Sequence, residues 1–297
     1  MGWKKVTDRV SLTNAEQFKM LYNEQRMNQG GDPYDYTVWN ADTDWQDEMF
    51  QTGFLTNNTV SITASGDRSK FYLGLGYVME EGSIKSEKLN KFTVNLHSEH
   101  KVTDFLRFGF QVNGVRALYP DAKGVGSALK AAPIAPVYDA ESGLLHTLPD
   151  FQRAQVWNPM IEPVLRGAHN KSANYRMAGN IYGELDLMKN LTFKATFSLD
   201  YASSQSRSYS PLIYVYNPDV EGCKERLTDK ESISQSKSTS MAAQSDYVLT
   251  YINQFGDHGL TLTAGLTTNY NEYSDLSGGR SQLPGYGVSI GEDIDKW

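Results

Sequence analysis

A chain of 297 residues, of which 39% are hydrophobic and 21% charged, could fold as two ordinary domains or as one large β-domain, so its fold class has to come from its sequence patterns. A formal net charge of −7 argues against a nucleic-acid partner, because the sequence shows no basic stripe that would neutralise phosphates. The single cysteine, Cys223, excludes an internal disulfide framework and a cysteine-ligated zinc site.

The start of the chain has no apolar segment behind Lys4 and Lys5, and no stretch contains the 18 or so consecutive apolar residues that a membrane helix requires. We therefore expect neither a signal peptide nor a membrane-spanning helix. A membrane β-barrel remains open, because its strands need only about 9–11 residues of alternating pattern.

The first predicted element is a helix of roughly four turns that is capped by Thr13 or Asn14 and ends near Gly30. Residues 32–47 follow as an acidic and aromatic segment, which we expect to be a solvated loop. A calcium site is the alternative for this segment, since carboxylates are good calcium ligands, but their spacing differs from that of an EF-hand loop.

Four strands are predicted between residues 57 and 115, because apolar side chains at every second position mark one face of a strand. Short turns at 66–69 and 102–105 join the strands of each pair. A looser polar segment at 81–90 connects the two pairs and is predicted to be a long connection.

A proline-rich insertion at 118–171 comes next, with a short helical piece near 127–132. Loops of this length inside a compact domain are usually functional or disordered. A second insertion, at 205–237, is rich in serine and contains Cys223.

The remaining strands are predicted at 175–187, 191–201, 238–253 and 258–273. Short turns at 188–190 and 254–257 join them in pairs, and a further long connection begins at 274. Short connections thus alternate with long ones along eight strands, as in outer-membrane barrels, where short turns lie at one rim and long loops at the other.

The predicted fold class is therefore all-β: an antiparallel, up-and-down transmembrane β-barrel segment of about eight strands, with long extracellular loops that contain short helices. A soluble β-sandwich or adhesin-like stack is the alternative. We favour the barrel because the hairpin strands are longer than the five or six residues typical of other sheets. Aromatic residues also gather near the strand ends, where a membrane interface places them.

The alternation assigns the strand residues to two faces, because a charge facing lipid near the midplane costs about 2–4 kcal/mol. The residues expected to face lipid are Val60, Ile62, Ala64, Phe193, Phe197 and Leu199. Those expected to face the lumen are Arg176, Glu184, Lys194 and Asp200. We expect an open, curved sheet, since the polar inward faces do not suit the filled interior of a closed eight-stranded barrel.

Catalytic sites are not predicted. His97, Glu99 and His100 suggest a metal site, but on a strand His97 and Glu99 share a face while His100 points away, so we interpret them as lumen and rim residues. The sequence contains no nucleophile elbow, Walker sequence or dinucleotide fingerprint. We predict no enzymatic activity, no metal and no cofactor.

Several short motifs, in the same order, resemble the SusC/RagA family of TonB-dependent outer-membrane transporters. These motifs are LTNAEQF at 12–18, TDWQDE at 43–48, VSITASG at 60–66, FYLGLGY at 71–77, APIAPVY at 132–138, and a loop motif at 157–159. The resemblance covers nearly the whole chain. It implies a 22-stranded barrel with an internal plug, located in the outer membrane, that imports oligosaccharides or peptides with a SusD-like surface lipoprotein.

The same resemblance implies that the plug domain, the segment that contacts the TonB complex and the remaining strands lie outside residues 1–297. We therefore expect 1–297 to be a partial barrel domain in contact with membrane lipid, roughly strands two to nine, with residues 3–6 as part of the first. The alternative function is that of a soluble, β-rich carbohydrate-binding or adhesin-like module.

Substrate contact is expected in the 118–171 loop. Tyr138 and Trp157 would stack on the apolar face of a sugar ring, and Asp139 and Asn158 would form hydrogen bonds with its hydroxyl groups. The alternative is that the two aromatic residues hold the loop together by packing against its prolines.

Overall fold

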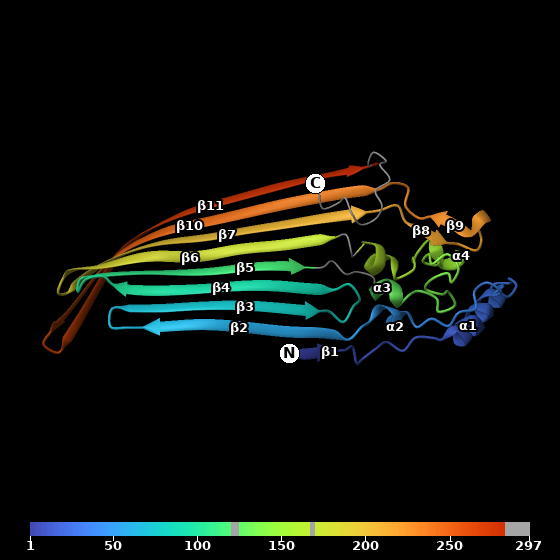
Figure 1. The fold of residues 1–297 in the computed structure, drawn as a ribbon, viewed down its shortest axis with the longest axis horizontal. Helices are drawn as coiled ribbons and strands as arrows, with labels where there is room; N and C mark the ends of the chain where they lie inside the picture. The colour runs from blue at the N-terminus through green and yellow to red at the C-terminus, as the bar shows by residue number, and fades with distance from the viewer. Residues whose placement is uncertain (120–124, 167–169, 283–297) are drawn as a thin grey trace.

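The computed structural model describes residues 1–119, 125–166 and 170–282 (Figure 1). A nine-stranded antiparallel sheet, in the order β1-β2-β3-β4-β5-β6-β7-β10-β11, forms most of it. Its strands are β1 (Gly2–Lys4), β2 (Gly53–Ser65), β3 (Ser69–Glu81), β4 (Lys88–Lys101), β5 (Leu106–Tyr119), β6 (Lys171–Met188), β7 (Leu191–Ser210), β10 (Ser232–Phe255) and β11 (His258–Ser281). Each long strand pairs with the next along the chain, which confirms the predicted up-and-down arrangement.

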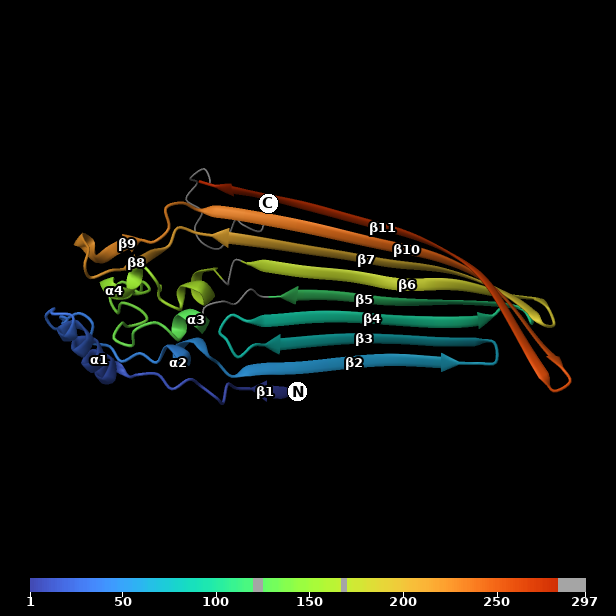
Figure 2. The same ribbon diagram turned by 180° about the vertical axis from the view of Figure 1, so that it is seen from behind.

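The other elements lie together at one end of the sheet, and the short turns lie at the opposite end (Figures 1 and 2). They are the helices α1 (Ala15–Asn28), α2 (Trp45–Met49), α3 (Val125–Ala128), α4 (Asp150–Arg153), η1 (Glu162–Arg166) and η2 (Glu221–Cys223), and the strands β8 (Tyr214–Tyr216) and β9 (Lys224–Arg226). No helix in the described part of the chain has the length and apolar character needed to cross a membrane.

Helix α1 forms where the sequence predicts it, and Asn14 is its cap. The Asn14 side chain accepts a hydrogen bond from the Gln17 backbone N–H at 2.9 Å, and the Gln17 side chain accepts one from the Asn14 N–H at 3.2 Å. This reciprocal pair satisfies two backbone donors that the first turn would otherwise leave without partners.

The sheet is open. Within the described residues, the last strand, β11, pairs only with β10. At the other edge, β1 pairs only with β2, and β2 pairs with β1 and β3. Residues Gly2–Lys4 pair with Gly53–Leu55, close to the position predicted for part of a first strand. The expectation of an open sheet with two edges is confirmed.

The pairing register separates the strand residues into two faces, as predicted. Residues directly opposite each other in neighbouring strands lie on the same face. One continuous row is Ile62, Leu73, Leu96, Val112, Gly179, Leu199, Ala243 and Tyr270. The row beside it, on the other face, includes Asn95, Asn113, Ala178 and Asp200. We call these the apolar face and the polar face of the sheet.

Charged residues on the polar face pair with each other across strands. Arg176 donates to both carboxylate oxygens of Asp200, at 3.0 and 2.5 Å. Arg107 lies 2.6 Å from the Glu184 carboxylate and 3.0 Å from that of Asp186. Lys194 lies directly opposite Glu184 in the register. These pairs show that the four charged residues predicted to face the lumen share one face.

Two predicted connections are shorter than expected. The 81–90 segment was expected to be a long loop, but the ladder continues to the pair Glu81–Lys88, whose charged groups lie 3.5 Å apart, so only 82–87 are outside the strands. The serine-rich insertion shrinks from 205–237 to 211–231, because β7 and β10 both extend into it. Because serine occupies both faces of these strand ends, the sequence shows no alternation of apolar and polar residues there. The two strands still pair through their backbones.

Candidate functional site: the loop cluster

The buried hydrophobic core lies outside the sheet, in the elements at its loop end. We call these elements, residues 10–49, 125–166 and 211–231, the loop cluster. Its most buried side chains are Trp39, Trp45, Met49, Ile134, Leu148, Ile161, Ile213 and Val215, each no more than 2% exposed. These segments therefore form a packed unit, although 32–47, most of 118–171 and 205–237 were predicted as loops without a common core.

The acidic segment contributes buried side chains to the core of this unit. Trp45 donates its ring N–H to the Ala132 carbonyl at 2.9 Å in a buried setting. Thr43 donates its backbone N–H to the Pro133 carbonyl at 2.8 Å and its hydroxyl to the Ala135 carbonyl at 2.7 Å. The expectation of a solvated loop holds for the aspartates, which are exposed, but is wrong for Trp39 and Trp45, which are buried in the core.

The carboxylates of the same segment bind within the fold. Asp44 caps α2 by accepting hydrogen bonds from the Gln46 and Asp47 N–H groups, and Asp42 accepts one from the Ala15 N–H at 2.8 Å. Asp47 pairs with Arg9. Among the described residues, no group of three or more acidic, histidine or cysteine side chains is arranged to hold a metal ion.

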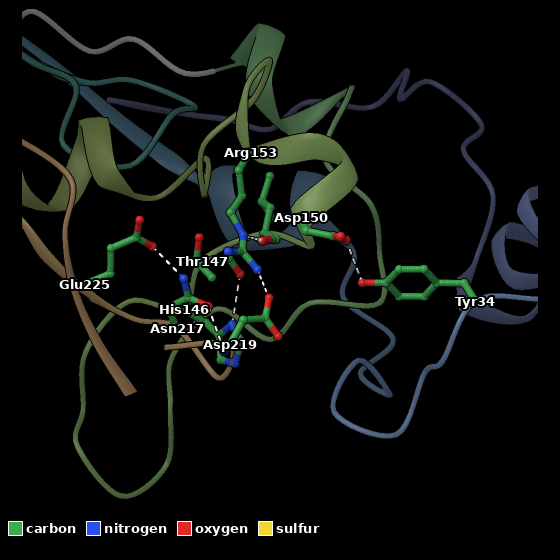
Figure 3. A network of polar contacts seen from close by, with 9 residues as sticks. Tyr34, His146, Thr147, Asp150, Arg153, Asn217, Asp219 and Glu225 are labelled. Atoms are coloured by element: carbon green, nitrogen blue, oxygen red, sulfur yellow. Dashed lines mark hydrogen bonds and ion pairs between the residues drawn. The ribbon is translucent and has the colours of Figure 1, made fainter. Parts of the chain in front are cut away.

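Polar contacts connect the segments of the loop cluster across long distances in sequence (Figure 3). Tyr34 donates its hydroxyl to the Asp150 carboxylate at 2.8 Å, and Arg153 pairs with Asp219. Partial burial and the neighbouring Asp150 carboxylate raise the pKa of the Tyr34 hydroxyl. This tyrosine therefore remains a neutral hydrogen-bond donor over the physiological range.

His146 lies inside this network and is 4% exposed. Its ring lies between Trp39 and Tyr216, with centroids 5.2 and 5.0 Å away. Its Nδ1 is 2.8 Å from the Thr147 carbonyl, and because a carbonyl only accepts, Nδ1 carries the hydrogen. Burial lowers the pKa of His146, and the Thr147 carbonyl only partly opposes this.

The lowered pKa predicts that the loop cluster loses stability in acid. A histidine whose pKa is lower in the folded state contributes stability above its unfolded pKa of about 6.5, and this stability is lost as pH falls below that value. We expect hydrogen exchange of the backbone at 134–149 and 213–217 to rise between pH 7.5 and pH 5, after correction for intrinsic rates. His146→Gln should abolish that rise, and an equal rise in this variant would show that another group is responsible.

The predicted substrate-contact residues lie on the surface of this unit. Tyr138 forms a bridge with Leu145, which closes a small hairpin, and Tyr138 is 45% exposed. The Asp139 carboxylate accepts hydrogen bonds from the Ser142 N–H and hydroxyl, both at 2.7 Å, and these lower its pKa. Trp157 is 41% exposed.

Asn158 connects the Trp157 loop to the Tyr138 hairpin. It is 3% exposed, and its amide nitrogen donates to the Val137 carbonyl at 3.0 Å and to the His146 carbonyl at 2.8 Å. Its side-chain oxygen accepts from the Met160 N–H at 2.9 Å. The structure thus brings the four predicted residues into one region. Asn158, next to Trp157, holds the two backbone segments of the hairpin that carries Tyr138 and Asp139.

Sequence reasoning did not single out Tyr34, His146, Arg153 or Asp219. Their contacts join residues 66 to 116 positions apart, as in Arg153–Asp219 and Tyr34–Asp150, and such pairs leave no local pattern. The only sequence signal was the density of aromatic residues between acids at 32–47.

Comparison with known sequences shows that the chain is similar to TonB-dependent receptors. No protein-family model matches it. It is 25% identical over 276 residues to TonB-dependent receptor P3 of Formosa agariphila, which covers 88% of this chain and 25% of the receptor. It is 26% identical over 145 residues to TonB-dependent receptor SusC of Bacteroides thetaiotaomicron, covering 48% of this chain and 14% of SusC.

Solved structures show the same fold. The RagAB peptide transporter superposes with a TM-score of 0.69 at 15% sequence identity, over 92% of this chain and 31% of that one. The RagAB peptide importer in its closed-closed state gives a TM-score of 0.68 at 16% identity, over 84% of this chain and 28% of that one.

The predicted resemblance to SusC/RagA receptors and the predicted β-barrel strand arrangement are confirmed by these comparisons. The proteins named above are receptors and transporters, consistent with a chain that is not an enzyme. The chain spans only about a quarter of the first relative's length.

Proposed function

We propose that residues 1–297 form part of the barrel wall and extracellular loops of a longer TonB-dependent receptor in the outer membrane, which imports oligosaccharides or peptides. The observation that carries this proposal is the apolar face, which is exposed along the whole sheet. Val60, Leu266 and Phe197 expose 67%, 61% and 46% of their surface, and they come from strands at both edges and the middle.

The height of the apolar face fits a bilayer. On β7 its residues extend from Leu191 to Tyr201. Ten residues advance roughly 33 Å along a strand, or about 25 Å across a membrane at a tilt of about 40°. This equals the apolar band of about 25 Å that outer-membrane barrels present to lipid.

A soluble carbohydrate-binding module would need a second layer over this face, because water-soluble proteins rarely expose apolar patches beyond a few hundred Å². The helices and short strands of the described residues lie at one end of the sheet and not over it (Figures 1 and 2). The barrel proposal therefore explains the exposed residues better.

The loop cluster would lie on the extracellular side and contact substrate and a SusD-like lipoprotein, while the TonB complex would act through parts of the receptor outside this chain. Three features support a contact surface here. Tyr138 and Trp157 are exposed, and Asp139, which follows Tyr138, supplies a carboxylate. Asn158, which follows Trp157, donates a hydrogen bond to the carbonyl just before Tyr138, and the packed core lies beneath these residues. Exposed rings on a rigid base bind at a low cost in conformational entropy.

Replacing Tyr138 and Trp157 by alanine in the full-length receptor is expected to reduce uptake at low substrate concentration by about tenfold or more, since each ring contact contributes on the order of 1 kcal/mol. Uptake of labelled oligosaccharide and peptide mixtures would be measured together with surface abundance. Phe105→Ala is the control, because Phe105 is 56% exposed in a turn at the opposite rim.

Reduced uptake at normal abundance, in the double variant and not in the control, would support contact with substrate. Unchanged uptake would eliminate the proposed surface. Reduced abundance without reduced uptake per receptor would instead indicate that the two rings pack the loops.

A further inference from the structure

A cavity of about 480 Å³ lies in the loop cluster, lined by residues from the segment that leads into α1, from 42–46 and from 129–133. This volume falls within the range of about 300–1,000 Å³ that is typical of small-molecule sites. None of the four residues predicted to contact substrate is among the described residues that line it. The cavity is therefore a separate candidate site.

Part of the cavity lining is apolar and belongs to the core of the loop cluster. Trp45, Ala131 and Ala132 are buried in that core and also line the cavity. The half-buried Phe18 ring lines it as well, and this ring stacks on Phe151 with the two centroids 6.2 Å apart. Packed aromatic and aliphatic side chains of this kind can hold the apolar face of a sugar ring.

Three polar side chains that line the cavity are fixed by the helices beside it. Asn14, Asp42 and Asp44 each accept hydrogen bonds from backbone N–H groups in the first turn of α1 or α2, at 2.8–3.2 Å. In each case only Oδ1 accepts. Within the described part of the chain, the Asn14 amide nitrogen and the second carboxylate oxygens of Asp42 and Asp44 bind no other group. One amide group and two acceptor oxygens therefore remain for a ligand, on side chains whose positions are already set.

The polar groups at the cavity suit a neutral ligand that both donates and accepts hydrogen bonds. The N–H groups that bind the Asp42 and Asp44 carboxylates offset part of their charge. Lys130, Ser11 and Thr13 also line the cavity and can donate from their side chains. Each sugar hydroxyl group is both a donor and an acceptor, so a sugar ring can satisfy this mixed set without bringing a charge of its own.

We propose that this cavity binds a neutral sugar unit of an oligosaccharide, with the apolar face of the ring against the side of the cavity formed by Phe18 and Trp45. Its hydroxyl groups then bind the free atoms of Asn14, Asp42 and Asp44. The inference rests on the proposed function, and it selects oligosaccharides over peptides as the substrate class. Because the three polar side chains are fixed before the ligand arrives, binding costs little conformational entropy in the protein.

The test compares two double variants of the full-length receptor, purified from outer membranes in a detergent without a sugar headgroup. The cavity variant is Asn14→Ser with Asp44→Ser, because serine still caps a helix with its one oxygen while the amide nitrogen and the second carboxylate oxygen are removed. The control variant, Asn28→Ser with Asp35→Ser, makes the same changes at exposed positions that do not line the cavity. Dissociation constants for maltose, cellobiose, mannobiose and the peptide trialanine would be measured by saturation-transfer NMR.

We expect at least one disaccharide to bind the unmodified receptor and the control equally well. The cavity variant should bind it about 20-fold more weakly, because each of the two lost hydrogen-bonding groups weakens binding roughly fivefold. Trialanine should not displace the sugar. If no disaccharide binds, if the cavity variant binds as tightly as the control, or if trialanine competes, the sugar site is overturned.

Protease resistance of residues 125–166 in both variants would show that the loop cluster is intact. If the cavity variant loses this resistance, Lys130→Ala makes the same comparison from an exposed side chain, and it should weaken binding roughly fivefold. Unchanged binding in Lys130→Ala would then overturn the site. Failure to recover the unmodified receptor in the outer membrane would count against the proposed function instead.

Discussion

Replacing Phe197 by lysine is expected to prevent the receptor from accumulating in the outer membrane. Phe197 lies in the middle of the apolar rows on β7, opposite Ile181 on β6, and is 46% exposed. A lysine facing lipid near the midplane costs about 2–4 kcal/mol, and the lost phenyl ring adds its own transfer free energy. Receptor recovered from outer-membrane fractions, measured by immunoblot with heat-modified mobility as the sign of folding, should fall at least about tenfold.

Ser198→Lys is the matched control, since it introduces the same charge one residue away on the polar face. Its strand neighbours in the register, Asn180 and Gln244, are polar, so the new ammonium group enters an environment that already holds polar groups. We expect near-normal abundance. Equal losses in both variants would contradict the assignment of the two faces.

Replacing Trp45 by alanine is expected to destabilise the loop cluster by about 3–5 kcal/mol, which is typical of removing a buried aromatic side chain. Trp45 is 2% exposed, and its loss also leaves the buried Ala132 carbonyl without its donor. Limited proteolysis of intact cells should then cleave between residues 125 and 166, and hydrogen exchange there should become fast, while the strands of the sheet remain protected.

Trp157→Ala provides the comparison, because that ring is 41% exposed. Its removal should leave protease resistance unchanged while uptake falls. Protease resistance that persists in Trp45→Ala would mean that the cluster does not depend on its core, and substrate contact would then lack the rigid base on which it is proposed to rest.

The strands could be read from the sequence wherever one face is apolar and the other polar. The perfect alternation from Leu191 to Tyr201 predicted both the strand and its faces, and the short turns followed from the gaps between alternating segments. The strand ends were missed where serine occupies both faces, as in β7 beyond Tyr201 and β10 before Ser238. There, backbone hydrogen bonds between the strands extend the sheet, and side-chain contacts such as that of Ser206 with Ser236, at 2.8 Å, add to them.

The loop cluster could not be predicted, because its core joins residues from separate insertions. Trp39 and Trp45 lie among five aspartates, and hydropathy alone places such a segment in water. Trp45 and the neighbouring Thr43 donate hydrogen bonds to the Ala132 and Ala135 carbonyls, about ninety residues away along the chain, and the Trp39 ring contacts that of His146.

Cysteine scanning of β7 tests the central claim most directly, because Cys223 is the only native cysteine in 1–297 and can be changed to serine. Single cysteines at 193 to 200 in the full-length receptor would be spin-labelled in outer membranes, and collision with oxygen, which dissolves in lipid, compared with a water-soluble nickel complex. We predict that the accessibility of the label alternates with a period of two residues. Collision with oxygen should dominate at Phe193, Phe197 and Leu199, whereas labels at Lys194 and Asp200 should collide mainly with the nickel complex or be immobilised. Nickel access at both sets alike, or oxygen favoured at Lys194 and Asp200, would contradict the placement of this sheet in the barrel wall.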